Sequence, residues 1–120
     1  LSDICIACCD QKLETLDLEW KNEKSLCIVL CSKGYPDKFE NNVKIEKLKN
    51  LNLENNDYIF HAGTKNKNNE IFSNGGRVLN FVSMSSSFKN SRKRVIKIIN
   101  QLNWKNGYFR KDIGFKIIDR

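Results

Sequence analysis

Residues 26–31 read Leu-Cys-Ile-Val-Leu-Cys, the longest apolar run of the chain. A short apolar run that is rich in β-formers is typical of a strand covered on both faces, whereas a membrane span needs roughly 18 to 20 apolar residues. The run continues into Ser32-Lys33-Gly34-Tyr35-Pro36, which contains the only proline of the chain. This glycine and proline predict a turn that ends the strand. We therefore expect a buried strand here and no membrane span.

The chain beyond this turn alternates between strand and turn signals. Strands are expected at residues 43–45, 57–61, 70–73 and 78–84, with a last strand introduced by Trp104, Tyr108 and Phe109. Small and polar residues at 62–69 are typical of a turn and a hairpin tip. The spacing therefore favours antiparallel pairing of neighbouring segments.

A single long helix is predicted over residues 88–102. It places Val95, Ile99 and Leu102 on one face, and Ser85 to Ser87 precede it as candidate caps. Charged residues occupy the opposite face, as an amphipathic helix on a sheet requires. The helix is thus expected to cover the sheet.

The start of the chain also has helical signals. Residues 2 to about 13 are typical of the end of a helix that Ser2 or Asp3 caps, and a polar connector around Trp20 follows. The order helix, antiparallel strands, helix, strand predicts an α+β fold with a small, mostly antiparallel sheet and flanking helices. Because the first residue is Leu and not Met, we expect a piece of a longer protein.

The composition indicates one domain, and the positive net charge by itself suggests a polyanion as partner. The 120 residues are 40% hydrophobic, enough for one core without metal or disulfide, and the net charge is +7. However, 16 of the 21 cations are Lys and 16 residues are Asn, which is typical of codon bias. The basic stretch Ser91-Arg92-Lys93-Arg94 leaves open a small nucleic-acid-binding module, but no aromatic residues interleave with its cations. We expect neither nucleic acid nor membrane as a partner.

Five cysteines raise the question of a metal site. Cys5-x-x-Cys8 with Cys9, followed by Cys27-x-x-x-Cys31, crudely resembles a four-thiolate zinc pattern. The residues between them are apolar, which favours small core residues over metal ligands. Without an export signal, the cysteines are expected to be reduced thiols of a cytoplasmic protein.

Residues for catalysis are scarce. His61 is the only histidine and follows a strand without an obvious carboxylate partner, so a structural role is favoured. No phosphate loop of the Walker type and no acidic pair for magnesium is present. We expect no catalytic residue and no metal site in this chain, which alone should be inactive.

Asn74-Gly75-Gly76-Arg77 is the strongest local signal. Adjacent glycines weaken a strand, so they indicate either a bulge or a ligand close to bare backbone. Together with an arginine they would offer an anion both amide donors and a guanidinium. Both interpretations remain open at this point.

Four motifs in order resemble the C-terminal domain of phosphoribosylamine-glycine ligase, also called glycinamide ribonucleotide synthetase, of the ATP-grasp superfamily. They are residues 27–36, Phe60-His61-Ala62-Gly63-Thr64, Asn74-Gly75-Gly76-Arg77-Val78-Leu79-Asn80 and Arg110-Lys111-Asp112-Ile113-Gly114-Phe115. The resemblance implies a rudimentary hybrid-motif fold for residues 23–120. Residues 1–22 resemble the last helix and linker of the preceding ATP-grasp domain.

The resemblance also implies an activity. The family joins glycine to 5-phosphoribosylamine in purine biosynthesis, using ATP and Mg²⁺ (or Mn²⁺) and a glycyl phosphate intermediate. Its ATP and metal ligands lie upstream, and nothing in this chain matches them. The expected partners are therefore 5-phosphoribosylamine, glycine, ATP and the upstream domains of the same protein.

The role implied for this chain is to close the cleft and hold the phosphate of the ribosylamine. By motif, the phosphate-binding residues would be Lys65, Gly75, Gly76 and Arg77. Supporting candidates are Lys33, His61, Arg110 and Asp112. Asp112 would orient Arg77 or Arg110, and His61 would tie the hairpin to a neighbouring carbonyl.

Overall fold

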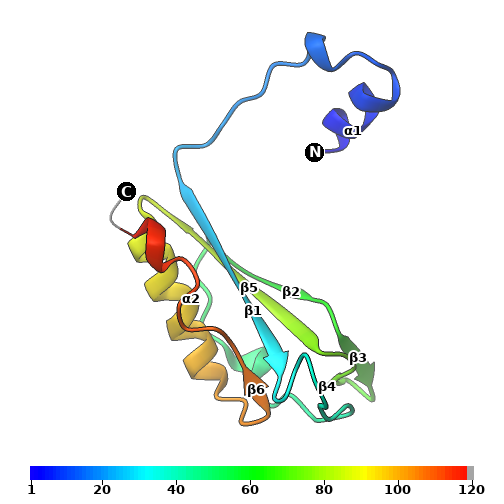
Figure 1. The fold of residues 1–120 in the computed structure, drawn as a ribbon, viewed down its shortest axis with the longest axis vertical. Coiled ribbons are helices and arrows are strands. Elements are labelled where there is room, and N and C mark those ends of the chain that lie inside the picture. Colours follow the sequence, from blue (N-terminus) through cyan, green and yellow to red (C-terminus); the bar gives the residue numbers. More distant parts are fainter. Residues whose placement is uncertain (119–120) are drawn as a thin grey trace.

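A four-stranded antiparallel sheet organises the chain (Figure 1). The structure is a computed structural model and describes residues 1–118. The strands lie in the order β2-β5-β1-β6, and β3 and β4 form a separate two-stranded sheet. The helices and strands are α1 (Ser2–Cys9), β1 (Lys24–Ser32), β2 (Asp57–His61), β3 (Thr64–Lys67), β4 (Glu70–Ser73), β5 (Arg77–Ser85), α2 (Phe88–Leu102) and β6 (Gly107–Tyr108). Short 3₁₀ turns lie at Leu13–Thr15, Leu48–Asn50 and Phe115–Ile117. The expected α+β class is confirmed.

Strand β1 alternates between a buried and an open face. Leu26, Ile28 and Leu30 are buried, whereas Cys27 is exposed. Directly opposed residues of antiparallel strands share a face, so Phe81 of β5 joins Ile28 in the core. The expectation that β1 is covered on both faces is wrong, because α2 covers only the face of Ile28.

The cysteines follow from the same alternation. Cys5, Cys8, Cys9 and Cys27 are exposed and Cys31 is partly exposed, and all five are free thiols. The expectation that they are core residues is therefore wrong. An apolar run cannot by itself tell a strand buried on two faces from one buried on a single face.

Helix α2 lies along the sheet, as its apolar face predicts (Figure 1). Val95, Ile98, Ile99 and Leu102 are buried against the sheet. The helix is capped by Ser87, whose hydroxyl accepts a hydrogen bond from the Asn90 amide at 3.2 Å. The bounds predicted for this helix are confirmed.

A hairpin forms beyond β2, but not the one that the sequence indicated: residues 64–67, expected in the turn and hairpin tip, form β3, and β4 pairs with β3 and not with β2. Strands β3 and β4 pair in register from Thr64 opposite Ser73 to Lys67 opposite Glu70. The candidate strand at 43–45 is only a single bridge beside β4, since Lys44 pairs with Phe72 alone. It still contributes a buried side chain, Ile45, to the core.

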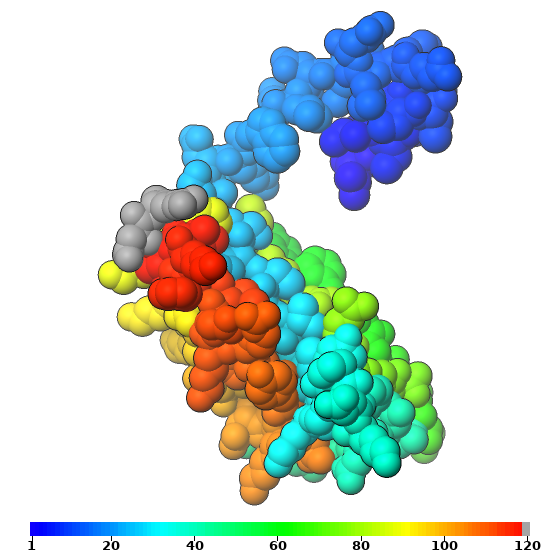
Figure 2. All heavy atoms as spheres, viewed as in Figure 1, coloured from blue at the N-terminus to red at the C-terminus, as the bar shows by residue number. Residues whose placement is uncertain are grey.

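The N-terminal segment extends away from the sheet (Figures 1 and 2). Helix α1 ends at Cys9 and not near residue 13, because Gln11 adopts a left-handed conformation with φ of 55°. Its N-cap is Leu1, without a side-chain hydrogen bond, so the expected capping by Ser2 or Asp3 is wrong. The boundary between residues 22 and 23 remains a prediction.

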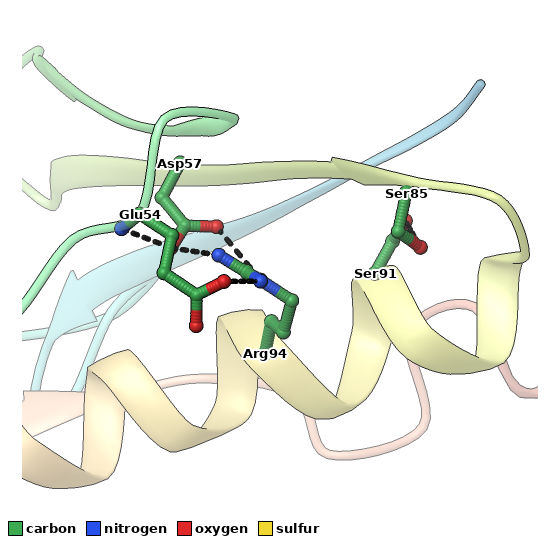
Figure 3. Close-up of polar contacts among 5 residues, drawn as sticks. All are labelled: Glu54, Asp57, Ser85, Ser91 and Arg94. Carbon is green, nitrogen blue, oxygen red and sulfur yellow. Dashed lines mark hydrogen bonds and ion pairs between the residues drawn. The ribbon is translucent and has the colours of Figure 1, made fainter.

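An ion pair fastens α2 to the start of β2 (Figure 3). The Asp57 side chain, only 2% exposed, accepts hydrogen bonds from Arg94 Nε at 3.2 Å and Nη2 at 2.7 Å. Arg94 also pairs with Glu54. Burial acts to raise the pKa of the Asp57 carboxyl, but the hydrogen bonds from Arg94 and the Glu54 amide outweigh it and hold the pKa below its usual value.

Within residues 1–118, we find no helix whose length and apolar character would let it cross a membrane.

Replacing Arg94 with Met should destabilise the domain by about 2 kcal/mol, because the buried Asp57 carboxylate loses its charged partner. Urea unfolding of the purified chain measures this. The matched control is Lys44→Met, which breaks the solvent-exposed pair of Lys44 and Glu70 and should change stability far less. Equal losses in the two variants would contradict the role of the Asp57 pair.

Asp57 also predicts sensitivity to acid. Because folding lowers its pKa, the stabilisation is fully present above the ordinary Asp pKa of about 4 and is lost as the pH falls through the lower folded value. The stability difference between wild type and Asp57→Asn should therefore shrink between pH 7 and pH 3. A difference that does not depend on pH would show that the charge of Asp57 is unimportant.

Candidate functional site

The candidate site lies at the turn between β4 and β5. In this turn the carbonyls of Gly75 and Gly76 are hydrogen-bonded, whereas within the described part of the chain their amides are not. The Gly75 carbonyl accepts a hydrogen bond from Ser32 Oγ at 2.9 Å, and the Gly76 carbonyl accepts one from the Ser32 amide at 2.7 Å. Among residues 1–118, the backbone hydrogen bonds give neither the Gly75 nor the Gly76 amide an acceptor. The carbonyls are thus held internally while two N–H donors remain available.

Close packing explains why these positions are glycines. A Cβ on Gly76 would lie 2.5 Å from Cε2 of the Tyr35 ring, and one on Gly75 would lie 3.3 Å from the Cα of Gly63. Neither glycine has a positive φ. The missing side chain of Gly76 therefore makes room for Tyr35, which the sequence did not suggest.

A β-bulge sets the direction of Arg77. Leu30 lies opposite Leu79, but Cys31 lies opposite Arg77, so Val78 is the extra residue. Both Val78 and Leu79 are completely buried. Bulges commonly re-aim a side chain in this way, and here Arg77 joins Cys31 on the open face of the sheet.

The Arg77 side chain is exposed and available. The ion pairs among the described residues involve Lys44, Arg94 and Arg110 as cations, but not Arg77. Its charge reaches Cys31: burial raises the pKa of this thiol, and Arg77 partly offsets the rise. A free guanidinium beside unpaired amides is able to bind an anion.

The other predicted phosphate ligand, Lys65, lies on β3 opposite Phe72 and is partly buried. Its side-chain ammonium makes no hydrogen bond or ion pair among residues 1–118. The structure thus leaves both predicted side-chain cations, Lys65 and Arg77, without internal partners, although they belong to different sheets.

Two of the supporting candidates occupy the periphery. His61 is exposed. Its Nδ1 is hydrogen-bonded to Thr64 Oγ1 at 2.8 Å, whereas the sequence suggested a backbone carbonyl as its partner. Lys33 lines a cavity of about 430 Å³ together with Ser32, Lys38 and Asn106. Neither has a contact that assigns it a role.

The remaining two candidates pair with each other. Arg110 Nε donates to Asp112 Oδ1 at 3.1 Å, and Nη2 donates to Oδ2 at 2.6 Å. The hydrogen bond from Arg110 lowers the pKa of the Asp112 carboxyl below its usual value. Asp112 therefore orients Arg110 and not Arg77, which was the other possibility.

Sequence reasoning missed Ser32 and Tyr35, which both contact the glycine turn. Ser32 continues the inward alternation of Leu26, Ile28 and Leu30, and a polar residue at an inward position is expected to find a hydrogen-bond partner. That signal was available in the sequence. The contact of Tyr35 with Gly76 was not, because it depends on how the loop folds back.

Residues 1–118 bring no three His, Cys, Asp or Glu side chains into an arrangement that would hold a metal ion. Three or more ligating side chains for Mg²⁺ are therefore not brought together within the described residues. These residues also do not gather the cysteines of the zinc-like pattern.

Comparison with known proteins identifies the family. The model of the phosphoribosylglycinamide synthetase C domain matches residues 25–116. The chain belongs to this family. The resemblance stated from the motifs is thereby confirmed.

Curated relatives of the phosphoribosylglycinamide synthetase C domain are considerably longer. A bifunctional purine biosynthetic protein of Dictyostelium discoideum is 38% identical over 99% of this chain and 15% of its own length. A phosphoribosylamine-glycine ligase of Vibrio vulnificus is 34% identical over the whole chain and 28% of its own length. The chain therefore spans less than a third of either relative.

A solved relative supports the fold. The crystal structure of phosphoribosylamine-glycine ligase from Thermotoga maritima aligns with a TM-score of 0.60 at 27% identity, covering 74% of this chain and 21% of that chain. The α+β architecture thus agrees with that of a homologue.

The packing of Gly76 gives a prediction. Replacing Gly76 with Ala should cost about 1 to 3 kcal/mol of stability, because the new methyl group collides with the Tyr35 ring. Urea unfolding of Gly76→Ala, Tyr35→Ala and the double variant measures the coupling. The cost of Gly76→Ala should shrink in the Tyr35→Ala background, and an unchanged cost would contradict this contact.

Proposed function

We propose that this chain is the C-terminal part of an ATP-dependent phosphoribosylamine-glycine ligase of purine biosynthesis. The observation that carries the proposal is the family match over residues 25–116, supported by curated relatives with that name. In the proposed reaction, ATP phosphorylates the glycine carboxylate to give glycyl phosphate and ADP. The amine of 5-phosphoribosylamine then attacks the glycyl carbonyl and displaces phosphate, which yields glycinamide ribonucleotide.

The part that we assign to this chain is to hold the phosphate of 5-phosphoribosylamine. The free amides of Gly75 and Gly76 and the unpaired guanidinium of Arg77 support this assignment. Lys65, on the outgoing arm of the hairpin, supplies a further cation. A phosphate dianion fixed at one end orients the amine at the other, and orientation is what an otherwise bimolecular attack needs.

We infer that ATP and Mg²⁺ (or Mn²⁺) bind outside the residues described here. No step of the proposed chemistry is assigned to a side chain of this chain, which contributes binding and closure of the cleft. The upstream domains of the same protein would then be its partners. Free thiols at all five cysteines are in keeping with a cytoplasmic enzyme.

The alternative of a nucleic-acid-binding module is not favoured. It relies on the cations of α2, and two of these are engaged within the domain. Arg92 donates hydrogen bonds to the carbonyls of Ile113 and Lys111, and Arg94 binds Asp57. These contacts give two of the three cations of the basic stretch a structural role.

Replacing Arg77 with Ala in the full-length ligase should raise the KM for 5-phosphoribosylamine by roughly 10- to 150-fold, since a charge-assisted contact is lost. The KM for ATP should stay nearly unchanged. Steady-state kinetics with each substrate varied in turn measure both values.

The matched control for this variant is Lys97→Ala, which removes an exposed cation from α2 and should leave both KM values unchanged. Equal increases in the two KM values of Arg77→Ala would exclude the proposed role in binding the ribosylamine phosphate.

A further inference from the structure

Ser32 fixes two consecutive peptide groups of the glycine turn. This residue ends β1 and is only 2% exposed. Its hydroxyl donates to the Gly75 carbonyl at 2.9 Å, and its amide donates to the Gly76 carbonyl at 2.7 Å. One buried side chain and its own backbone therefore hold both carbonyls of the turn.

The hydrogen bond to the Gly75 carbonyl also fixes the direction of the Gly76 N–H, because both groups belong to the same planar peptide bond. In a trans peptide the carbonyl and the following N–H point in opposite directions. Because the Gly75 carbonyl points at Ser32 Oγ, the Gly76 N–H points away from Ser32. This is one of the two amides that have no acceptor among residues 1–118.

A pair of glycines would not keep this direction unaided. Glycine reaches more backbone conformations than any other residue, so an isolated Gly-Gly turn would present its amides in many orientations. An anion site needs them fixed before the ligand arrives, since ordering them on binding weakens affinity.

Ser32 is itself held from two sides. The amide of Lys33 donates to the Asn106 carbonyl at 2.7 Å, and Ser32 lies opposite Gly107 of β6. The Ser32 carbonyl accepts the Tyr35 amide at 3.1 Å, which brings the Tyr35 ring back over Gly76. The residue that hydrogen-bonds the glycine turn is thus itself held in place by its neighbours.

We propose that Ser32 is a positioning residue for the phosphate site, acting through the backbone of Gly75 and Gly76. The inference rests on the proposed function, because it presumes that these amides meet the ribosylamine phosphate. Ser32 touches no substrate. Its hydroxyl aims the Gly76 N–H into the site.

The test is steady-state kinetics of the full-length ligase with Ser32→Ala. Loss of one hydrogen bond that orients a donor should raise the KM for 5-phosphoribosylamine by about three- to tenfold. The KM for ATP should not change. Ser32→Thr retains a hydroxyl and should restore most of the lost affinity, a rescue that volume alone would not produce.

Ser91→Ala is the matched control. Ser91 is also completely buried, and its hydroxyl donates to the Lys24 carbonyl at 2.7 Å, near the opposite end of β1. Its loss should lower the thermal unfolding temperature without raising the KM for 5-phosphoribosylamine. A similar KM increase in Ser91→Ala would mean that general destabilisation accounts for the effect, and the proposal would be wrong.

Arg77→Ala separates the two ways in which the idea can fail. If Arg77→Ala raises the KM for 5-phosphoribosylamine and Ser32→Ala does not, the phosphate site stands and the role of Ser32 is refuted. If neither variant changes that KM, the proposed phosphate site is refuted together with the role of Ser32.

Discussion

The alternation of β1 is the constraint on which the rest of the structure depends. Its inward side chains, Leu26, Ile28 and Leu30, pack in the core with α2, and its backbone pairs with β5 on one side and β6 on the other. Ser32 is the next inward position, and there hydrogen bonds to the glycine turn take the place of an apolar contact. The same periodicity that builds the core therefore places the candidate site at the end of the strand.

Much of this could be predicted from the sequence, for identifiable reasons. The helix at residues 88–102 is a local feature, determined by apolar spacing and a serine cap, and the strand at residues 70–73 was likewise recognised, although its partner was not. The formation of the helix depends little on distant contacts. The glycine pair before Arg77 was also recognisable as a special backbone position.

The features that were missed depend on tertiary contacts. Whether Cys27 is buried depends on what covers the second face of the sheet, and the apolar run contains no information on that. The end of α1 depends on the backbone conformation of Gln11. The pairing of Arg110 with Asp112 was one of two possibilities that spacing alone could not separate.

The bulge at Val78 determines which side chains of β5 face the core and which face outward. In a regular ladder Val78 would lie opposite Cys31 and face outward, and Arg77, the residue before it, would face inward. The one extra residue allows two neighbouring apolar side chains to enter the same layer and leaves the guanidinium before them outside. Pairing the same residues without the bulge would therefore drive a positive charge into the hydrophobic layer, whereas a chain that lacked Val78 would pair regularly and still leave Arg77 opposite Cys31.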